Sequence, residues 1–161
     1  MKNTNVICII LVFVFVAWTL FIFSNSLKNG EESGKISGGV VDKVKPLIDP
    51  EDKIQKDAFH VFVRKMAHGI EYFVHGLLAA ALCHTIALKK HPPMWYLPFM
   101  LSLLTAVVDE FIQMHTQRTS SIIDVLIDFC GASIGIIVIF AALFASKKIK
   151  LTKNIQKSKN S

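Results

Sequence analysis

The chain has few of the residues that build disulfide frameworks or zinc sites. Its 161 residues include three cysteines, Cys8, Cys83 and Cys130, and each lies inside an apolar run at a spacing unrelated to the others. An odd number of cysteines without a Cys-x-x-Cys pair argues against both kinds of site. We expect the three to act as small hydrophobic residues, and they do not decide the redox compartment.

Sequence signatures of several other chemistries are missing as well. The chain has no glycine-rich phosphate-binding loop and no nucleophile motif of the Gly-x-Ser-x-Gly type. It also lacks the interleaved aromatic and basic residues that are typical of nucleic-acid binding. We therefore expect no nucleic-acid partner and no cofactor, and we attribute the net charge of +6 to contact with membrane lipid.

Arginine is scarce, since only Arg64 and Arg118 are arginines among 18 basic residues. In a lysine-rich chain, arginine at two such positions suggests a planar partner with two acceptor oxygens, such as a carboxylate or a phosphate. The alternative, that both arginines pair with acids inside the protein, is equally open.

Hydrophobic residues are abundant, at 52% of the chain, and the mean hydropathy is +0.48. Four apolar runs come close to the ~20 residues that a helix needs to cross a bilayer. They are Val6–Phe23, Met66–Leu88, Met94–Met114 and Ile122–Ala145. The predicted fold is an all-α membrane protein, an up-down bundle of four transmembrane helices over residues 1–146, followed by a lysine-rich cytoplasmic tail over 147–161.

The first run is expected to remain as a transmembrane helix, because it exceeds the ~7–15 apolar residues of a signal peptide. The connection that follows it carries four apolar residues at helical spacing: Ile36, Val40, Val44 and Leu47. This spacing predicts a short interfacial helix ending near Pro46, which would lie over the outer mouth of the bundle as a lid. An ordinary surface helix, or a flexible loop after Gly30 and Gly34, is the alternative.

Lysines indicate the orientation in the membrane. Residues 147–161 carry six lysines and no acid, and the second short loop adds Lys89, Lys90 and His91. Because positive loops stay in the cytoplasm, we predict a multi-pass protein of the bacterial cell membrane with both termini cytoplasmic. The polar residues of all four spans then gather on the outer side.

Five acids lie within the predicted spans or at their ends: Glu71, Asp109, Glu110, Asp124 and Asp128. An ionised side chain at membrane depth costs at least ~2.5–3.5 kcal/mol, so such acids indicate a functional site. Four basic residues close by in sequence are the candidate partners: Arg64, Lys65, His68 and Arg118.

Helical geometry places these residues on shared faces. Five polar or aromatic residues of the second span fall within an arc of about 100°: Arg64, His68, Glu71, Tyr72 and His75. In the fourth span, Asp124 and Asp128 share an arc of about 60° with Gly131 and Gly135, which predicts close contact with another helix. The spacing of His68, Glu71 and His75 is compatible with a metal, but core histidines are commoner and we assign no metal ligands.

Helix capping can explain the position of Asp124 but not that of Asp128. Ser121-x-x-Asp124 resembles a capping box, which would account for Asp124 at a helix start. Asp128 lies one turn deeper, where no free amide groups remain, so it needs a partner or a proton.

Three blocks of polar residues together resemble the VanZ family, small membrane proteins linked to teicoplanin resistance. The blocks are Arg64-Lys65-x-x-His68-x-x-Glu71-Tyr72, Asp109-Glu110-x-x-Gln113, and Arg118-x-x-Ser121-x-x-Asp124-x-x-x-Asp128-x-x-Gly131-x-x-x-Gly135. The polar Ser24-Asn25-Ser26 resembles the family's serine-rich segment, although Asn25 replaces the expected serine or glutamine. His115-Thr116-Gln117 departs from the Pro-Gly that often precedes the arginine, so the turn before Arg118 is not predicted.

The resemblance implies a role in the cell envelope and leaves the mechanism open. The leading hypothesis is a polar pocket, open to the outside, that binds an anionic envelope ligand or a glycopeptide antibiotic. Its predicted residues are Arg64, Lys65, His68, Glu71, Tyr72, Asp109, Glu110, Gln113, Arg118, Ser121, Asp124 and Asp128.

Two other hypotheses remain, and the oligomeric state is open in all three. One is a membrane-embedded enzyme acting on a lipid-linked or envelope substrate, with His68, Glu71 or Glu110 as catalytic candidates and a cation held by Glu71, Asp109 and Asp128. The other is a proton-coupled transporter. The scarcity of polar residues near Cys83 and Phe99 argues against it, because a proton route across the membrane would need polar side chains there.

Overall fold

A computed structural model describes residues 2–28, 30–90, 95–116 and 121–159 of the chain. The described residues form five helices and no strand. The helices are α1 (Lys2–Ser26), α2 (Gly30–Ile48), α3 (Lys56–Lys90), α4 (Leu97–His115) and α5 (Ile122–Lys159).

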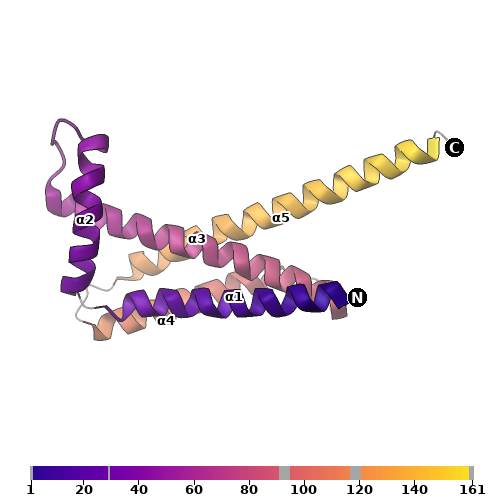
Figure 1. Cartoon of the computed structure of the whole chain (residues 1–161), viewed down its shortest axis with the longest axis horizontal. Coiled ribbons are helices and arrows are strands. Elements are labelled where there is room, and N and C mark those ends of the chain that lie inside the picture. Colours follow the sequence, from indigo (N-terminus) through magenta and orange to yellow (C-terminus); the bar gives the residue numbers. More distant parts are fainter. Residues whose placement is uncertain (1, 29, 91–94, 117–120, 160–161) are drawn as a thin grey trace.

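The four long apolar helices run alternately in opposite directions, which places the two chain ends at the same end of the bundle (Figure 1). Their membrane-spanning segments are Thr4–Ser26, Lys56–Leu88, Leu97–His115 and Ile122–Gln156. The prediction of an all-α, four-helix transmembrane bundle is therefore confirmed.

Two helices, α3 and α5, extend by ten residues or more beyond their predicted apolar runs. Helix α3 begins at Lys56, ten residues before Met66, and α5 continues past Ala145 through the lysine-rich segment to Lys159. Charged residues end an apolar run but not a helix, because lysine and arginine are good helix formers. Helix α4 begins three residues later than predicted, with Pro98 in its first turn, where the missing amide hydrogen costs nothing.

Glycines bring α3 and α5 into the closest contact in the bundle. A Cβ added to Gly76 would lie 2.0 Å from the carbonyl oxygen of Ala132, and one added to Gly131 would lie 2.4 Å from that of Gly69. Gly135 is equally close to the backbone of Phe73. The predicted protein-facing stripe of α5 is thus a backbone-to-backbone contact, the type that small residues permit in membranes.

Helix α3 is the centre of the bundle, since it contacts each of the other helices, whereas α1 contacts only α3 and α4 among the described residues. Most apolar side chains of α1 point outward, and Ile9 and Phe13 are 69% and 74% exposed. A helix that is apolar all round and mostly unburied is what contact with lipid tails produces.

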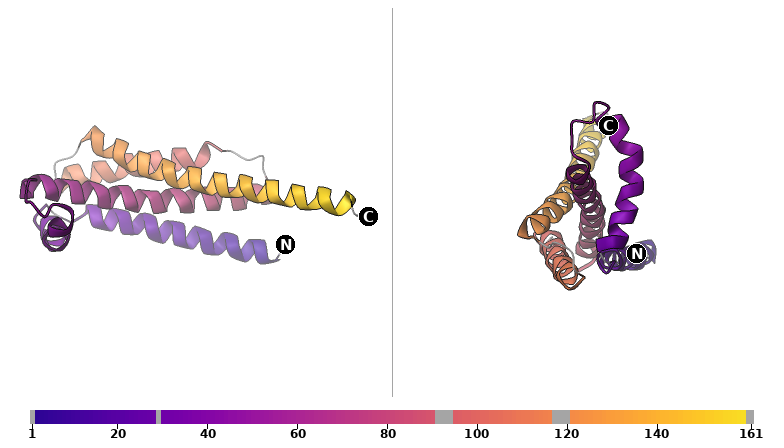
Figure 2. Two further views of the ribbon diagram at one scale, coloured as in Figure 1. Left: turned by 90° about the horizontal axis from the view of Figure 1, so that it is seen from above. Right: turned by 90° about the vertical axis from the view of Figure 1, so that its left-hand side faces the viewer.

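Helix α2 crosses the end of the bundle opposite the chain ends (Figure 1). Viewed along the bundle, it lies beside α3, on the other side from α4 and α5 (Figure 2). Buried Val41 and an ion pair of 2.9 Å between Asp42 and Lys56 attach it to α3. The predicted helix exists, but it contacts α3 alone among the described residues and does not cover the space between α3, α4 and α5.

The turn from α2 to α3 is held by Asp49. Its carboxylate accepts hydrogen bonds from the backbone amides of Lys53, at 3.0 Å, and Ile54, at 2.7 Å. These bonds, that of Ile54 above all, lower the pKa of Asp49 from its ordinary value of 3.8. A hydrogen bond from Lys56 likewise lowers the pKa of Asp42.

Candidate functional site

The predicted site residues that the structure describes gather at the end of the bundle that lies opposite the chain ends. We call this region the polar end. It is formed by the C-terminal ends of α1 and α4, the N-terminal half of α3 and the first two turns of α5. Its deeply buried members are Ser26, Tyr72, Asp109, Glu110, Gln113 and Asp128.

The centre of the polar end is a group of three side chains from three helices. Nδ1 of His68 lies 4.0 Å from Oδ2 of Asp109 and 3.9 Å from Oδ1 of Asp128. Both aspartates are almost completely buried, at 0% and 1% exposure. Alternating helix directions bring α3, α4 and α5 together here, so residues separated by up to sixty positions form one cluster.

Gln113 connects this cluster to α1. Its amide nitrogen donates to Oδ2 of Asp109 at 3.0 Å and to Oγ of Ser26 at 3.2 Å. The hydroxyl of Thr116 donates to the carbonyl oxygen of Ser26 at 3.2 Å. Ser26 therefore anchors the end of α1 to the last turn of α4.

Glu110 holds the start of α5. Its Oε1 accepts a hydrogen bond of 2.5 Å from the backbone amide of Ser121, and Oγ of Ser121 accepts one from the amide of Ile123 at 3.1 Å. The predicted capping box is thus half correct, because Ser121 caps the helix but Glu110 takes the place of Asp124 at the Ser121 amide. Asp124 instead accepts a hydrogen bond of 2.6 Å from Nζ of Lys65.

The predicted site included no residue of α1, although α1 contributes hydrogen bonds to the polar end. Asn25 donates from Nδ2 to Oε1 of Glu71 at 3.0 Å, and Ser26 is bonded to Gln113. Trp18 adds a hydrogen bond of 3.0 Å from its indole nitrogen to the carbonyl oxygen of Glu71. The signal was present in the sequence, since Ser24-Asn25-Ser26 is a polar ending to a long apolar run.

Tyr72 and His75 point into the core behind the cluster. His75 is buried, its Nδ1 is 3.3 Å from Oγ of Ser102, and its ring contacts the rings of Phe15 and Tyr72. His75 is therefore a core histidine with a hydroxyl partner. Tyr72 is completely buried beside His75.

A narrow cleft leads to the cluster. Its volume is about 10 Å³, and its walls are formed by Arg64, Lys65, His68, Gln113, Asp124, Ile127 and Asp128. Basic side chains thus line the same opening as the buried acids. Arg118, the other predicted arginine, lies outside the described residues.

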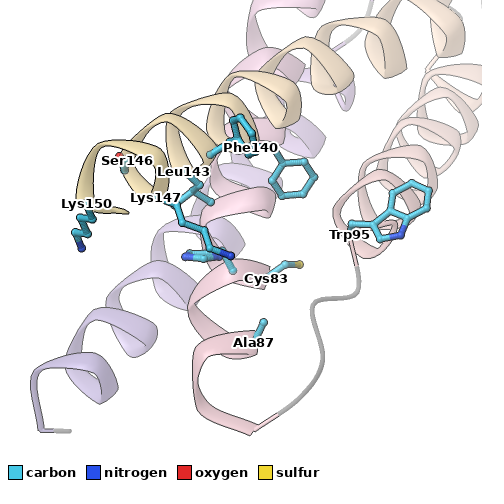
Figure 3. Close-up of a pocket in the computed structure, with 10 residues that line it drawn as sticks. Cys83, Ala87, Trp95, Phe140, Leu143, Ser146, Lys147 and Lys150 are labelled. Atoms are coloured by element: carbon cyan, nitrogen blue, oxygen red, sulfur yellow. The ribbon is translucent and has the colours of Figure 1, made fainter. Parts of the chain in front are cut away.

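The opposite end of the bundle holds a much larger and more apolar cavity, of about 520 Å³. Figure 3 shows Cys83 and Ala87 of α3, Phe140 and Leu143 of α5, and Trp95, which precedes α4, around this space. Lys147 and Lys150 follow on α5. None of the predicted site residues lines this cavity.

Comparison with known proteins identifies the family. No curated protein and no solved structure matches the chain. The sequence profile described as VanZ/LLP1 matches residues 10–145, from α1 into α5, and so includes every residue of the polar end described above. The chain is therefore a multi-pass membrane protein that belongs to the VanZ/LLP1 family.

Proposed function

We propose that the polar end binds an anionic group of a cell-envelope ligand or of a glycopeptide antibiotic such as teicoplanin. The observation that carries this proposal is the cleft in which Arg64 and Lys65 stand beside His68 and Asp128. The VanZ resemblance supports the same ligand class.

Lys65 is the side chain best placed to exchange partners. It is 33% exposed and pairs with Asp124, which is 22% exposed. Ion pairs this accessible are worth about 0–1 kcal/mol, so an incoming carboxylate or phosphate can replace Asp124 at little cost. A cleft of about 10 Å³ has room for about one water molecule, and ligand entry therefore requires Lys65 to move away from Asp124.

Orientation is part of the proposal. The lysines of α5 beyond Ser146 lie at the end that holds both chain termini, and positive segments remain in the cytoplasm. The polar end then opens to the extracytoplasmic side, where peptidoglycan precursors, lipid head groups and glycopeptides occur.

Susceptibility of a teicoplanin-sensitive Gram-positive host tests the proposal. Cells would express the wild type, Glu110→Gln or the lipid-facing control Val138→Ala at equal membrane abundance, measured by immunoblot. We expect the wild type and Val138→Ala to reduce susceptibility to teicoplanin more than to vancomycin, and Glu110→Gln to lose this effect because its bond to Ser121 positions α5. Equal loss in Val138→Ala, or no wild-type effect, would refute a resistance role for the polar end.

A second candidate function is supported by the position of His68, which is half-buried between two buried aspartates. An imidazole in contact with carboxylates is a common general base, and the adjoining cleft has room for a water molecule. This arrangement suits hydrolysis of a lipid-linked envelope substrate. Turnover of such a substrate by the purified wild type, abolished by His68→Gln, would favour the enzyme over the binding protein.

A further inference from the structure

His68, Asp109 and Asp128 are arranged as metal ligands are. One potential ligand atom from each lies within 4.8 Å of the others. Two ligands that are each about 2.1 Å from a metal lie about 3.0–3.5 Å apart in octahedral or tetrahedral geometry. The distances of 3.9 and 4.0 Å from His68 to the two aspartates exceed this range by less than 1 Å, and all three atoms lie within 4.8 Å of one another, so side-chain rotations that bring the aspartates together would complete the site.

Unpartnered polar atoms around the trio provide an independent indication of a ligand. Among the described residues, Oδ1 of Asp128, Oε2 of Glu110 and the hydroxyl of Tyr72 are buried without a hydrogen bond. Tyr72 is completely buried and Asp128 is 1% exposed. Buried oxygens are almost always bonded in folded proteins, so this concentration at one place points to a bound group.

The charges around Asp128 favour a cation. Asp109 and Asp128 lie against the same imidazole nitrogen of His68, at 4.0 and 3.9 Å, and Asp124 lies one turn before Asp128 on α5. Among the described residues, the ion-pair partner of Asp128 is His68 alone, because the neighbouring Lys65 is paired with Asp124. A divalent cation between the aspartates would remove the repulsion between them and explain why both acids are tolerated at membrane depth.

The donor set and the space define the ion. One imidazole nitrogen with carboxylate oxygens is a mixed set that suits Mn²⁺ or Zn²⁺ better than Ca²⁺, which takes oxygen ligands in larger number. The adjoining cleft of about 10 Å³, lined by His68 and Asp128, has room for about one water molecule as a further ligand.

We propose that His68, Asp109 and Asp128 bind one divalent cation, Mn²⁺ or Zn²⁺. The sequence suggested two other sets of ligands. One was Glu71, Asp109 and Asp128, and in the structure His68 takes the place of Glu71. The other was His68, Glu71 and His75, but His75 bonds to Ser102. All three proposed metal ligands belong to the chain itself, so the metal alone can test the site without the anionic ligand.

Titration with the metal alone tests the site. Wild-type protein in lipid nanodiscs would be stripped with a chelator and titrated with MnCl₂, with bound Mn²⁺ counted by electron paramagnetic resonance. We expect one saturable Mn²⁺ per chain with a nitrogen hyperfine coupling from His68. We also expect Zn²⁺ to compete for the same site.

Three variants distinguish the trio from other carboxylates. His68→Gln should lose the nitrogen coupling and weaken binding by about tenfold or more, and Asp128→Asn should weaken it comparably. Glu51→Gln, which alters an exposed acid in the α2–α3 turn, should change nothing. Size-exclusion profiles and helical circular dichroism would show whether each variant is folded.

Two outcomes would overturn the site. One is the absence of saturable Mn²⁺ or Zn²⁺ binding by folded wild type. The other is a saturable site that keeps its nitrogen coupling in His68→Gln and its affinity in Asp128→Asn. Neither outcome bears on teicoplanin susceptibility, so failure of the metal site is distinguishable from failure of the proposed function.

Discussion

The two ends of the bundle are built from the same helices and differ in almost every physical property. At the polar end, buried acids, a histidine and an amide are bonded across four helices, and the cleft beside the buried aspartates has a volume of about 10 Å³. At the other end, apolar side chains surround a cavity of about 520 Å³. The polar side chains of this bundle therefore lie beside a narrow cleft, whereas the cavity at the other end is lined mainly by apolar side chains.

Side-chain size explains the difference. Gly76, Gly131 and Gly135 allow α3 and α5 to touch through their backbones along the polar end and the middle of the bundle. Beyond Gly135, α5 continues with large residues such as Phe140, and the two helices separate toward the C-terminus (Figure 1). Close backbone contact thus fixes the positions of His68 and Asp128. His68 directly precedes Gly69 on α3, and Asp128 lies three residues before Gly131 on α5.

The largest expected effect follows from breaking this contact. Gly76→Ala places a Cβ 2.0 Å from the carbonyl oxygen of Ala132, and a backbone atom cannot yield as a flexible side chain does. We expect a loss of about 1–3 kcal/mol or more in stability and reduced membrane abundance, measured by thermal unfolding in detergent and by immunoblot. Gly69→Ala is the matched control in the same helix, because only Cγ2 of Ile127 is near, at 4.0 Å. Equal unfolding temperatures for the two variants would contradict the packing account.

A serine at each end gives the next comparison. Ser26→Ala removes the buried hydroxyl that accepts a hydrogen bond from Gln113, and we expect a loss of about 1 kcal/mol in stability. Ser146→Ala removes an exposed hydroxyl that bonds only within its own helix, so the change should be within about 0.5 kcal/mol. Chemical denaturation of both variants in the same detergent measures the difference. A larger loss of stability for Ser146→Ala than for Ser26→Ala would contradict the claim that the polar end is the more tightly bonded one.

A substitution in the cleft is expected to have a smaller effect on stability. Lys65→Gln breaks the partly exposed bond to Asp124 and should cost at most about 1 kcal/mol, while ligand binding or resistance falls sharply. Lys65→Arg keeps the charge and should retain more activity than Lys65→Gln. Unfolding and susceptibility measurements on the same preparations separate the two effects. Normal activity in a folded Lys65→Gln protein would exclude Lys65 from the site.

The smallest effect is a local pH dependence at the α2–α3 turn. Because the pKa of Asp49 is lowered in the folded protein, its stabilisation is complete above the ordinary value of 3.8 and is lost as pH falls through the lowered pKa. Hydrogen exchange at the amides of Lys53 and Ile54, corrected for intrinsic rates, should therefore accelerate below pH 3.8 and remain slow at pH 6. Asp49→Asn should abolish this pH dependence; an unchanged profile would show that other contacts hold the turn.

The sequence predicted the membrane fold well because apolar runs and glycine stripes act locally. The four spans, their alternating directions and the contact face of Gly131 and Gly135 all follow from periodicity along single helices. Helix ends were predicted poorly, since Lys56 and the lysines beyond Ala145 continue helices outside the apolar region.

Pairing within the polar end could not be derived from one helix at a time. Ser121 looked like the partner of Asp124, yet its amide bonds to Glu110 of the preceding helix. Ser26 gains its role only because α1 ends beside Gln113, eighty-seven residues later in the chain. Contacts between helices depend on rotation about each axis, which hydrophobic periodicity fixes only approximately.

Accessibility of the two ends to a membrane-impermeant thiol reagent tests the central claim most directly. In a background with Cys8→Ala, Cys83→Ala and Cys130→Ala, single cysteines would replace Lys53, which is 75% exposed beside the polar end, or Lys150, which is exposed at the other end. We predict that intact cells label Lys53→Cys and that Lys150→Cys is labelled only after permeabilisation. The reverse pattern would place the polar end in the cytoplasm, beyond the reach of an extracellular ligand, and would contradict the account.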